Sequence, residues 1–335
     1  MAAETVSIIV LTYNRKRLLK DCLDSLLEQN STGDGLEILV ADDGSDDGTE
    51  KFVAGYSAAH ANIKWLSHKH QGISATRNMG IRAAQGEIIA IVADDYILDR
   101  SYIQVILEFF RSHSDALVVR FKIVASRDDL GSRISHYYYD VSMRRRLYNQ
   151  SLEKPSGWFA TLRAFFQKMP ALHEEITTQH ELEASGAAAF HRSVFDQVGL
   201  FDENLLRAED SDLTLRLRAR GIEVYYHPYL HIQHQYERLM LDTVRKSFES
   251  GWSRYHYFRK HAITPHFADG SLKSKLAVKL GTLLNALRHL ETFSQFVIYA
   301  PFLVIFEGAN KLGFLCAWIC SIRAGNKPAS SNVEQ

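Results

Sequence analysis

Short apolar runs alternate with segments of helical periodicity over the first 100 residues. The β-rich runs are Val6–Leu11, Leu36–Ala41, Ile63–Leu66 and Glu87–Val92. The segments with helical spacing are Leu18–Leu27, a stretch starting near Asp47, and Ser74–Ala84. Strands that alternate with helices at such short separations predict an α/β fold, with a mostly parallel central sheet flanked by helices.

The pattern becomes harder to interpret beyond residue 100. Tyr102–Phe110 predicts a helix and Ala116–Val124 predicts a strand. Residues 130–180 are rich in Tyr, Arg and Phe and predict helical or irregular structure. Order returns with apolar runs at 185–190 and 224–233, and the second of these predicts a strand.

The C-terminal third predicts a helical extension over residues 241–325, followed by a disordered tail at 326–335. Its two apolar runs, Phe296–Phe306 and Phe314–Ile322, are each too short to cross a bilayer core of about 30 Å. The linker between them contains a Glu, an Asn and a Lys, which are costly inside a bilayer. We therefore expect interfacial helices or a shallow re-entrant hairpin, with packing on the catalytic domain or a homodimer contact as alternatives.

Composition narrows the class of protein. Hydrophobic residues make up 46% of the chain and charged residues 23%, as in ordinary folded proteins. The formal net charge is zero, so we expect no nucleic-acid partner. The basic stretch 239–290 has nine Lys or Arg against three acids and suits an anionic membrane surface. Because the first residues do not resemble a signal peptide, we expect a cytoplasmic protein, peripheral on the inner face of the plasma membrane.

The cysteines give no sign of a disulfide framework. Cys22 lies in a helical pattern, and Cys316 and Cys320 lie four residues apart in an apolar stretch. Buried thiols are the favoured interpretation of that spacing.

Polar clusters follow three of the predicted strands, at Thr12–Arg15, Asp42–Ser45 and Asp94–Asp95. Ligands of open α/β sheets bind beyond the carboxyl ends of the strands, so these clusters predict one site. Asp94 and Asp95 could bind Mg²⁺ or Mn²⁺, which would also bind diphosphate oxygens. The alternative is that they form a solvated acidic turn. The Asp and Gly residues of segment 42–49 suit a base-binding loop, or an Asx turn followed by a helix cap.

Two further segments carry candidate chemistry. Glu209, Asp210 and Asp212 precede an apolar periodic segment, so they are either helix-capping acids or a general base presented at a helix start. His234 ends the predicted strand 224–233 and is either a metal ligand or a surface residue. Spacing alone does not separate it from the other His residues of that strand.

Taken in order, these segments resemble the family 2 glycosyltransferases, which have the GT-A fold. The resemblance covers roughly residues 5–100 and 183–236. Its motifs are Val10–Arg15, Val40–Ser45 with Asp47–Thr49, Gly72–Gly80, Gly86–Glu87, Asp94–Asp95, Ser185–Arg192, Val198–Glu203, Glu209–Leu213 and Pro228–His234. It implies a GT-A domain over residues 1–240, with a donor half at about 1–100 and an acceptor half at about 101–240.

The resemblance also implies residue roles. The nucleotide-sugar-binding positions would be Thr12, Tyr13, Asn14, Asp43, Arg77, Asn78 and Asp94. Tyr13 would lie near the base, Asp43 would accept a hydrogen bond from a base N–H, and Asp94 would face the ribose or donor sugar. Asp95 and His234 would bind the metal, and Asp210 would act as the catalytic base with Glu209 supporting it. Ala93 replaces the first Asp of the family's DXD motif, so one carboxylate of that motif is missing.

These positions imply an inverting, nucleotide-sugar-dependent glycosyltransferase with Mn²⁺ or Mg²⁺ as cofactor. The donor expected from the family is a UDP-sugar, and the acceptor a glycan or a lipid-linked hydroxyl, as in polysaccharide biosynthesis at the cell envelope. Two alternatives stay open at this point. One is a catalytically silent relative that binds a nucleotide sugar, and the other is a nucleotidyltransferase, although the N-terminus has no Gly-rich, Lys-containing phosphate loop.

Overall fold

The computed structural model describes residues 5–30, 35–138, 175–179, 182, 185–205, 207–236, 240–262 and 293–323. The chain divides into two compact units. Unit 1 consists of residues 1–132 and 173–236, and unit 2 consists of residues 133–172 and 237–335. The predicted disordered tail and most of the segment 130–180 lie outside the described residues.

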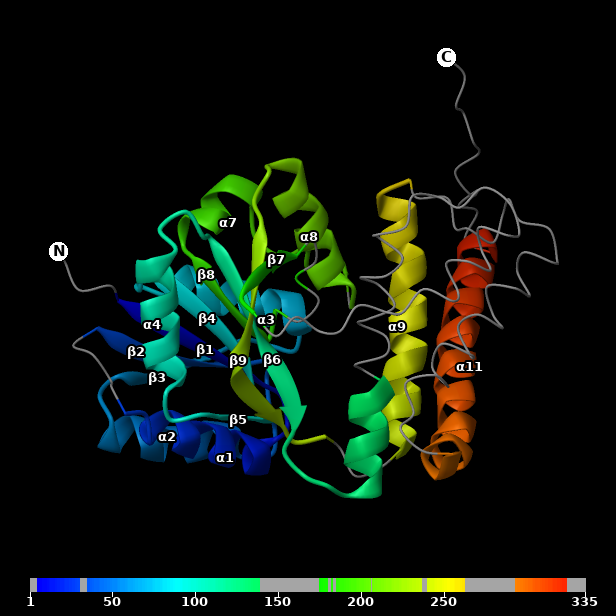
Figure 1. The fold of residues 1–335 in the computed structure, drawn as a ribbon, viewed down its shortest axis with the longest axis horizontal. Helices are drawn as coiled ribbons and strands as arrows, with labels where there is room; N and C mark the ends of the chain where they lie inside the picture. The colour runs from blue at the N-terminus through cyan, green and yellow to red at the C-terminus, as the bar shows by residue number, and fades with distance from the viewer. Residues whose placement is uncertain are drawn as a thin grey trace, which may run out of the picture. The chain divides into compact units, whose positions relative to one another are not determined.

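Unit 1 is built on one mixed sheet (Figure 1). The described strands are β1 (Val6–Thr12), β2 (Leu36–Asp42), β3 (Ile63–Ser67), β4 (Ile88–Ala93), β5 (Tyr96–Leu98), β6 (Val118–Ala125), β7 (Thr177–Gln179), β8 (Ala187–His191) and β9 (Val224–His234). They follow the order β3-β2-β1-β4-β8-β6-β9-β5, with β7 paired to β9. Strands β1 to β4 are mutually parallel, and β6 is parallel to β9. Strands β5, β7 and β8 run antiparallel to their neighbours.

The helices of unit 1 cover both faces of this sheet. They are α1 (Lys16–Leu27), α2 (Thr49–Ala59), α3 (Ile73–Ala83), α4 (Tyr102–Ser112), α7 (Ser193–Val198) and α8 (Glu209–Ala219). Ile81 of α3, Val194 of α7 and Leu213 of α8 pack in one cluster with Ile9 and Ile91 of the sheet. Figure 1 shows α1 and α2 at the opposite side of the sheet from α7 and α8.

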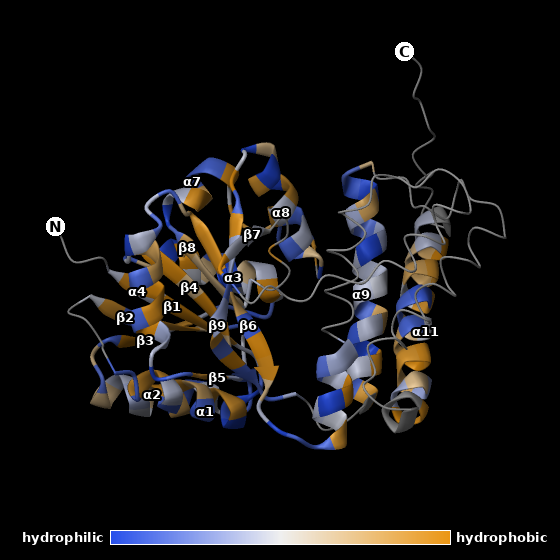
Figure 2. Ribbon diagram, viewed as in Figure 1, coloured by the Kyte–Doolittle hydropathy of each residue, from blue (hydrophilic) through white to orange (hydrophobic). Residues whose placement is uncertain are grey.

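Burial on both faces explains the continuous apolar runs of the central strands. All seven residues of β1 are buried, so its sequence has no alternation of polar and apolar positions. Figure 2 shows hydrophobic strands between helices of mixed hydropathy. The contact between α3 and β1 is especially close, because a Cβ at Gly80 would lie 2.4 Å from Ile9 Cγ2. The α/β class and the mostly parallel sheet are therefore confirmed.

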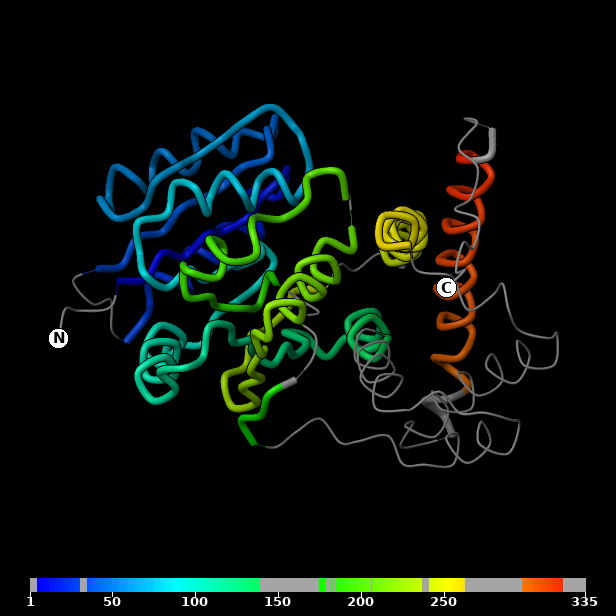
Figure 3. Tube along the Cα trace, turned by 90° about the horizontal axis from the view of Figure 1, so that it is seen from above, coloured from blue at the N-terminus to red at the C-terminus, as the bar shows by residue number. Residues whose placement is uncertain are grey.

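Unit 2 contains two long helices, α9 (Met240–Lys260) and α11 (Phe293–Arg323), which lie side by side (Figures 1 and 3). Their backbones approach closely, since a Cβ at Gly251 would lie 1.7 Å from the Asn310 carbonyl oxygen. The buried Asn310 amide donates to the Ser247 carbonyl of α9 at 3.0 Å. Ile134, from the segment before residue 139, packs with Tyr299 and Phe306 of α11.

Helix α11 corrects the expectation of two short apolar helices. The two predicted runs join into one helix, in which Glu307 and Lys311 form an ion pair at 3.8 Å. Within the described residues, its segment Val297–Ser321 has the length and composition that could cross a membrane. The prediction that Cys316 and Cys320 are buried thiols is also wrong, because Cys316 is partly exposed and Cys320 is exposed.

Candidate active site

The loops that follow β1 and β2 are tied together by hydrogen bonds. Asp43 N donates to the Thr12 carbonyl at 3.0 Å, Asn14 N donates to Ser45 Oγ at 2.8 Å, and Asp46 N donates to Asn14 Oδ1 at 2.8 Å. Asn14 has a left-handed backbone, with φ of 53°, which Asn tolerates better than most residues. Its side chain and backbone therefore act as a structural link between the two loops.

The acidic motif after β2 combines the two interpretations that its sequence allowed. Asp42 forms an Asx turn, because its Oδ1 accepts from Ser45 N at 3.0 Å and from Ser45 Oγ at 2.6 Å. Asp47 Oδ1 accepts from Thr49 N at 3.1 Å, next to the start of α2. Asp47 Oδ2 also accepts from Lys16 N at 3.0 Å, whereas Asp43 turns to a third loop.

That loop follows β3 and surrounds the Asp43 carboxylate. Asp43 Oδ1 accepts from Gln71 N at 2.8 Å, and Oδ2 accepts from Gly72 N at 3.0 Å. His70 Nδ1 lies 2.9 Å from Oδ2. The His70 ring also stacks on Tyr13, with 4.4 Å between the ring centroids. Tyr13 and Asp43, which the sequence places 30 residues apart, therefore share one neighbour.

Asp94 and Asp95 lie directly after β4 and are both buried. Thr12 Oγ1 donates to Asp94 Oδ2 at 2.8 Å. Arg15 Nη1 contacts both acids, at 3.1 Å from Asp94 Oδ1 and 2.9 Å from Asp95 Oδ2. His234 Nε2 lies 3.2 Å from Asp95 Oδ2. Burial raises the pKa of Asp94 to about 7 despite the opposing effect of Arg15, and the Asp95 carboxylate adds to the rise.

The donor set around Asp95 fits a hard divalent cation. Carboxylate oxygen and imidazole nitrogen are ligands that Mn²⁺ accepts. The Arg15 guanidinium already lies between the two carboxylates, so this position is built to hold positive charge. The described residues contain no group of three or more His, Cys, Asp or Glu that would enclose a metal by itself. Any cation here would therefore need oxygen ligands from a bound molecule or water.

A second acidic group lies at the start of α8, where Glu209 and Asp210 meet Arg77 of α3. Arg77 Nη1 lies 2.5 Å from Glu209 Oε1 and 3.7 Å from Asp210 Oδ1. Arg77 and Glu209 are buried. Burial and the adjacent Asp210 raise the pKa of Glu209, and Arg77 opposes that rise. Asp210 Oδ1 is a buried atom without a hydrogen-bond partner among the residues that the structure describes.

Tyr96 is the residue that the two acidic groups have in common. Its ring meets the His234 ring edge to face, with 5.1 Å between the centroids, and His234 contacts Asp95. Burial lowers the pKa of Arg77, but Glu209 and Asp210, with a smaller effect of Tyr96, outweigh it and raise that pKa. That Asp95 and Asp210 belong to one site stays a prediction.

Two of the predicted nucleotide-binding residues have other partners. Arg77 is committed to the α8 acids, as described above, and its guanidinium also lies over the Phe201 ring at 5.0 Å. The Asn78 amide donates to the Phe201 carbonyl at 2.9 Å and to Glu203 Oε1 at 2.8 Å, and its Oδ1 accepts from Phe201 N at 3.0 Å. These contacts fix the segment that leads into α8, and they give neither residue a contact with the strand-end loops.

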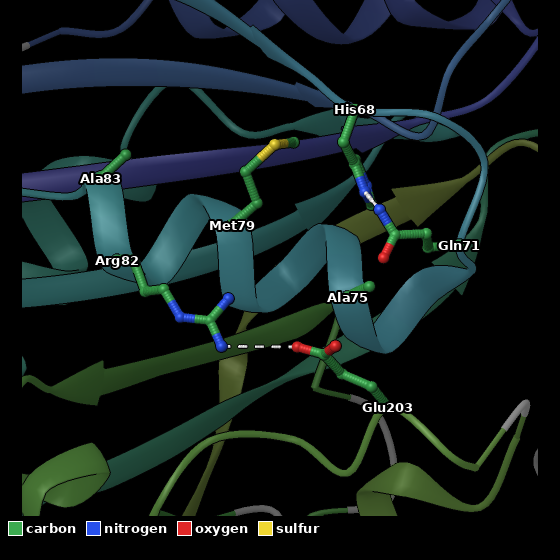
Figure 4. Close-up of a pocket in the computed structure, with 7 residues that line it drawn as sticks. All are labelled: His68, Gln71, Ala75, Met79, Arg82, Ala83 and Glu203. Carbon is green, nitrogen blue, oxygen red and sulfur yellow. Dashed lines mark hydrogen bonds and ion pairs between the residues drawn. The ribbon is translucent and has the colours of Figure 1, made fainter.

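A pocket of about 460 Å³ lies along α3 (Figure 4). Its lining residues are His68, Gln71, Ala75, Met79, Arg82, Ala83 and Glu203. Figure 4 shows Arg82 and Glu203 facing one another, and they form an ion pair at 3.4 Å. None of the predicted site residues lines this pocket. It adjoins the site at His68, whose Nε2 lies 3.4 Å from Asp43 Oδ1, and at Gln71, whose backbone N donates to the same oxygen at 2.8 Å.

Sequence comparison decides the family. A model described as "Glycosyl transferase family 2" matches residues 7–198, more than half of the chain. The chain belongs to this family. This family 2 chain therefore carries a glycosyltransferase domain, and the match covers β1 to β4 with the carboxylates that follow them.

Curated relatives support the same assignment. EpsH of Bacillus subtilis is 31% identical over 144 residues, and EpsJ of the same organism, an uncharacterized glycosyltransferase, is 26% identical over 268 residues. Chondroitin synthase of Escherichia coli is 29% identical over 143 residues. The family 2 chain spans 41% of EpsH, 70% of EpsJ and 20% of chondroitin synthase, and these matches cover 42%, 76% and 42% of the chain itself.

A solved structure agrees with the fold. The mannosyltransferase PcManGT from Pyrobaculum calidifontis, in complex with GDP-Man and Mn²⁺, superposes with a TM-score of 0.55. The match covers 97% of this chain and 88% of that one at 17% identity. The GT-A fold predicted from the motifs is thus confirmed.

The sequence motifs assign no role to three residues of this site. Arg15 ends the motif Val10–Arg15, and a cation next to a strand end with two acids is a usable signal for it. His70 lies two residues before the segment Gly72–Gly80 and outside the motifs. Tyr96 directly follows Asp95, and only its ring contact with His234 places it in the site.

Proposed function

We propose that this protein transfers a sugar from a nucleotide-sugar donor, in particular a UDP-sugar, to a hydroxyl group of a glycan or a lipid-linked acceptor, with inversion at the anomeric carbon. The observation that carries the proposal is the pair of acidic groups in unit 1, Asp95 with His234 and Asp210 with Arg77. The first group supplies a carboxylate suited to a cation and a diphosphate, and the second supplies a carboxylate suited to a proton transfer.

The donor half would bind the nucleotide at the ends of β1, β2 and β4. Tyr13 supplies an exposed ring for stacking, and Asp43 supplies a carboxylate for a base N–H. Asp94, held by Thr12 and Arg15, would face the ribose or the donor sugar. Asn14 would contribute by fixing the loop, since its side-chain oxygen already accepts from Asp46 N.

Asp95 and His234 would hold the divalent cation, Mn²⁺ or Mg²⁺. When bound there, the cation would stabilise the negative charge that develops on the leaving diphosphate. Arg15 lies on the same two carboxylates, so it supplies positive charge at this position from the chain itself.

Asp210 would act as the general base. Its Oδ1 has no hydrogen-bond partner within the described residues, while the neighbouring Glu209 is paired with Arg77. Asp210 would take the proton of the acceptor hydroxyl as the acceptor oxygen attacks the anomeric carbon. The bond from that carbon to the diphosphate breaks on the opposite face, the nucleoside diphosphate leaves, and the configuration inverts.

The test of this proposal is a donor panel. Purified protein is screened with UDP-, GDP- and dTDP-sugars and Mn²⁺ by thermal shift, and each stabilising donor is then assayed for release of nucleoside diphosphate with candidate acceptors. Release from a UDP-sugar supports the proposal. Binding without release under all conditions would indicate a silent relative, and release of pyrophosphate would indicate a nucleotidyltransferase.

The metal role has its own measurement. Asp95→Ala should remove the Mn²⁺-dependent part of UDP binding in calorimetric titrations, while metal-independent binding remains. A substitution of the surface acid Asp196 is the matched control, because it lies on α7 and is exposed. Unchanged Mn²⁺ dependence in Asp95→Ala would contradict the assignment of this residue.

Unit 2 is the candidate for membrane association. Helix α11 exposes large apolar side chains along much of its length, including Val304 at 58% and Leu312 at 54% exposure. The polar residues in the middle of α11 have partners: Glu307 forms an ion pair with Lys311, and Asn310 donates a hydrogen bond to α9. Attachment of the protein to the inner face of the plasma membrane would bring it to lipid-linked acceptors. Co-sedimentation with anionic liposomes, lost in a Val304→Glu, Leu312→Glu variant that remains folded, is the expected result.

A further inference from the structure

The side chain of His70 makes two contacts that the proposed function reserves for the donor's base. Its ring stacks on Tyr13 at 4.4 Å between centroids and 19° between planes. Its Nδ1 lies 2.9 Å from Asp43 Oδ2. A flat ring that stacks on Tyr13 with a ring nitrogen close to Asp43 is the arrangement in which a base would bind.

The Asp43 carboxylate has little capacity for an additional donor while His70 is in place. An ionised carboxylate has about four acceptor positions on its two oxygens. Gln71 N and Gly72 N donate to Oδ1 at 2.8 and 3.1 Å, and Gly72 N also reaches Oδ2 at 3.0 Å. The His70 ring takes the remaining side of Oδ2. A base N–H can therefore form a good hydrogen bond with Asp43 only after the His70 side chain has moved away.

The backbone of this loop is fixed, but the His70 side chain is not. A Cβ at Gly44 would lie 2.8 Å from both the His68 carbonyl oxygen and His70 N, so the loop packs closely on the turn after β2. The His70 side chain itself is 56% exposed. An exposed side chain changes rotamer within nanoseconds, so it can move aside without movement of the loop.

We propose that His70 occupies the base position of the donor-free site and swings out when the nucleotide binds, so that it lowers nucleotide affinity by competition. This inference rests on the proposed function, because it takes Tyr13 and Asp43 as the base-binding pair. A protein whose competent state is only a fraction of the population binds with its affinity reduced by that fraction. His70 thereby sets how much nucleotide is needed to fill the site.

The test is calorimetric titration of the full chain with UDP in the presence of Mn²⁺. His70→Ala should bind UDP about 3- to 30-fold more tightly than the unmodified protein, as expected for the loss of one competing polar contact with Asp43 and one ring stack. His70→Phe keeps the stack but removes the polar contact, so its affinity should lie between the two. His60→Ala, at the end of α2, is the matched control and should leave the affinity unchanged.

A second measurement follows the ring directly. The His70 ring protons should have upfield NMR shifts from the stack on Tyr13, and addition of UDP should move them to solvent-like values. Weaker UDP binding in His70→Ala, or upfield shifts that increase with UDP, would show that His70 is a wall of the base site and would overturn the proposal. Equal affinity in all variants would also overturn it. If neither the unmodified protein nor His70→Ala binds any of the UDP, GDP or dTDP nucleotides, the proposed function itself fails.

Discussion

Replacement of Asp210 by Asn is the most informative perturbation of the proposed base. The substitution keeps the size and planarity of the side chain and removes only its ability to accept a proton. In the described part of the chain, Asp210 Oδ1 has no hydrogen-bond partner and lies 3.7 Å from Arg77 Nη1, so few contacts change. The loss of that weak interaction is partly offset, because the repulsion with the buried Glu209 carboxylate also disappears. We expect the free energy of unfolding to change by less than about 1 kcal/mol.

The effect on turnover should be far larger. A positioned general base contributes on the order of 10²- to 10⁴-fold to rate, so kcat should fall by that factor. UDP affinity should stay within about twofold, because Asp210 has no described contact with the loops after β1, β2 and β4. A loss confined to kcat is the signature of an interaction made only in the transition state.

The assay is steady-state release of UDP with the best donor from the panel, combined with calorimetric UDP binding and a thermal melt of each variant. Asp196→Asn is the control, since it removes an exposed acid from the neighbouring helix α7. The reasoning is refuted if Asp210→Asn retains more than about a tenth of the unmodified kcat. It is equally refuted if UDP binding and kcat fall by the same factor.

Three further outcomes concern pH, thiols and helix packing. Partial burial acts to raise the pKa of Glu37, but hydrogen bonds led by that from Ser7 outweigh it and lower the pKa. Glu37→Gln should therefore lower the free energy of unfolding, measured in urea at pH 7, by about 1 kcal/mol. The difference between the two proteins should shrink as the pH falls below 4.5, the ordinary pKa of a Glu carboxyl, and vanish once the carboxyl is protonated in the folded state. Burial raises the pKa of Cys22 well above its usual range, so iodoacetamide mass spectrometry of the native protein should find Cys320 alkylated and Cys22 unmodified. Gly251→Leu should separate α9 from α11 and increase protease cleavage in unit 2. If the two units are independent, the same variant should leave the thermal unfolding of unit 1 unchanged.

The order of strands and helices in the donor half could be predicted from sequence because its signals are local. The buried strands of a parallel sheet have continuous apolar runs, and the helices between them have a 3.6-residue period. The predicted ranges of β1, β2, β3 and β4 differ from the observed ones by no more than two residues. Short elements with little periodicity, such as β5, β7 and α7, could not be found in this way.

The prediction of two separate apolar segments is wrong because the polar residues between them continue the same helix, α11. A helix places residues four apart on one face, so Glu307 and Lys311 pair with each other. Asn310 finds a partner only on α9. These contacts reduce the free-energy cost of placing polar groups in an apolar helix, and the apolar runs by themselves do not reveal them.

The sequence by itself determined the fold class, the family and the acids that follow the strands, since each of these depends on residue type and local spacing. Only the tertiary structure decided the partners of those acids. It placed Arg15 on Asp94 and Asp95, Arg77 on Glu209, and His70 between Tyr13 and Asp43. Arg15 meets Asp94 and Asp95 because parallel strands bring their carboxyl ends to one edge of the sheet, and Arg77 meets Glu209 because α3 and α8 pack in one cluster with the same sheet. No local pattern encodes which side chains will touch there.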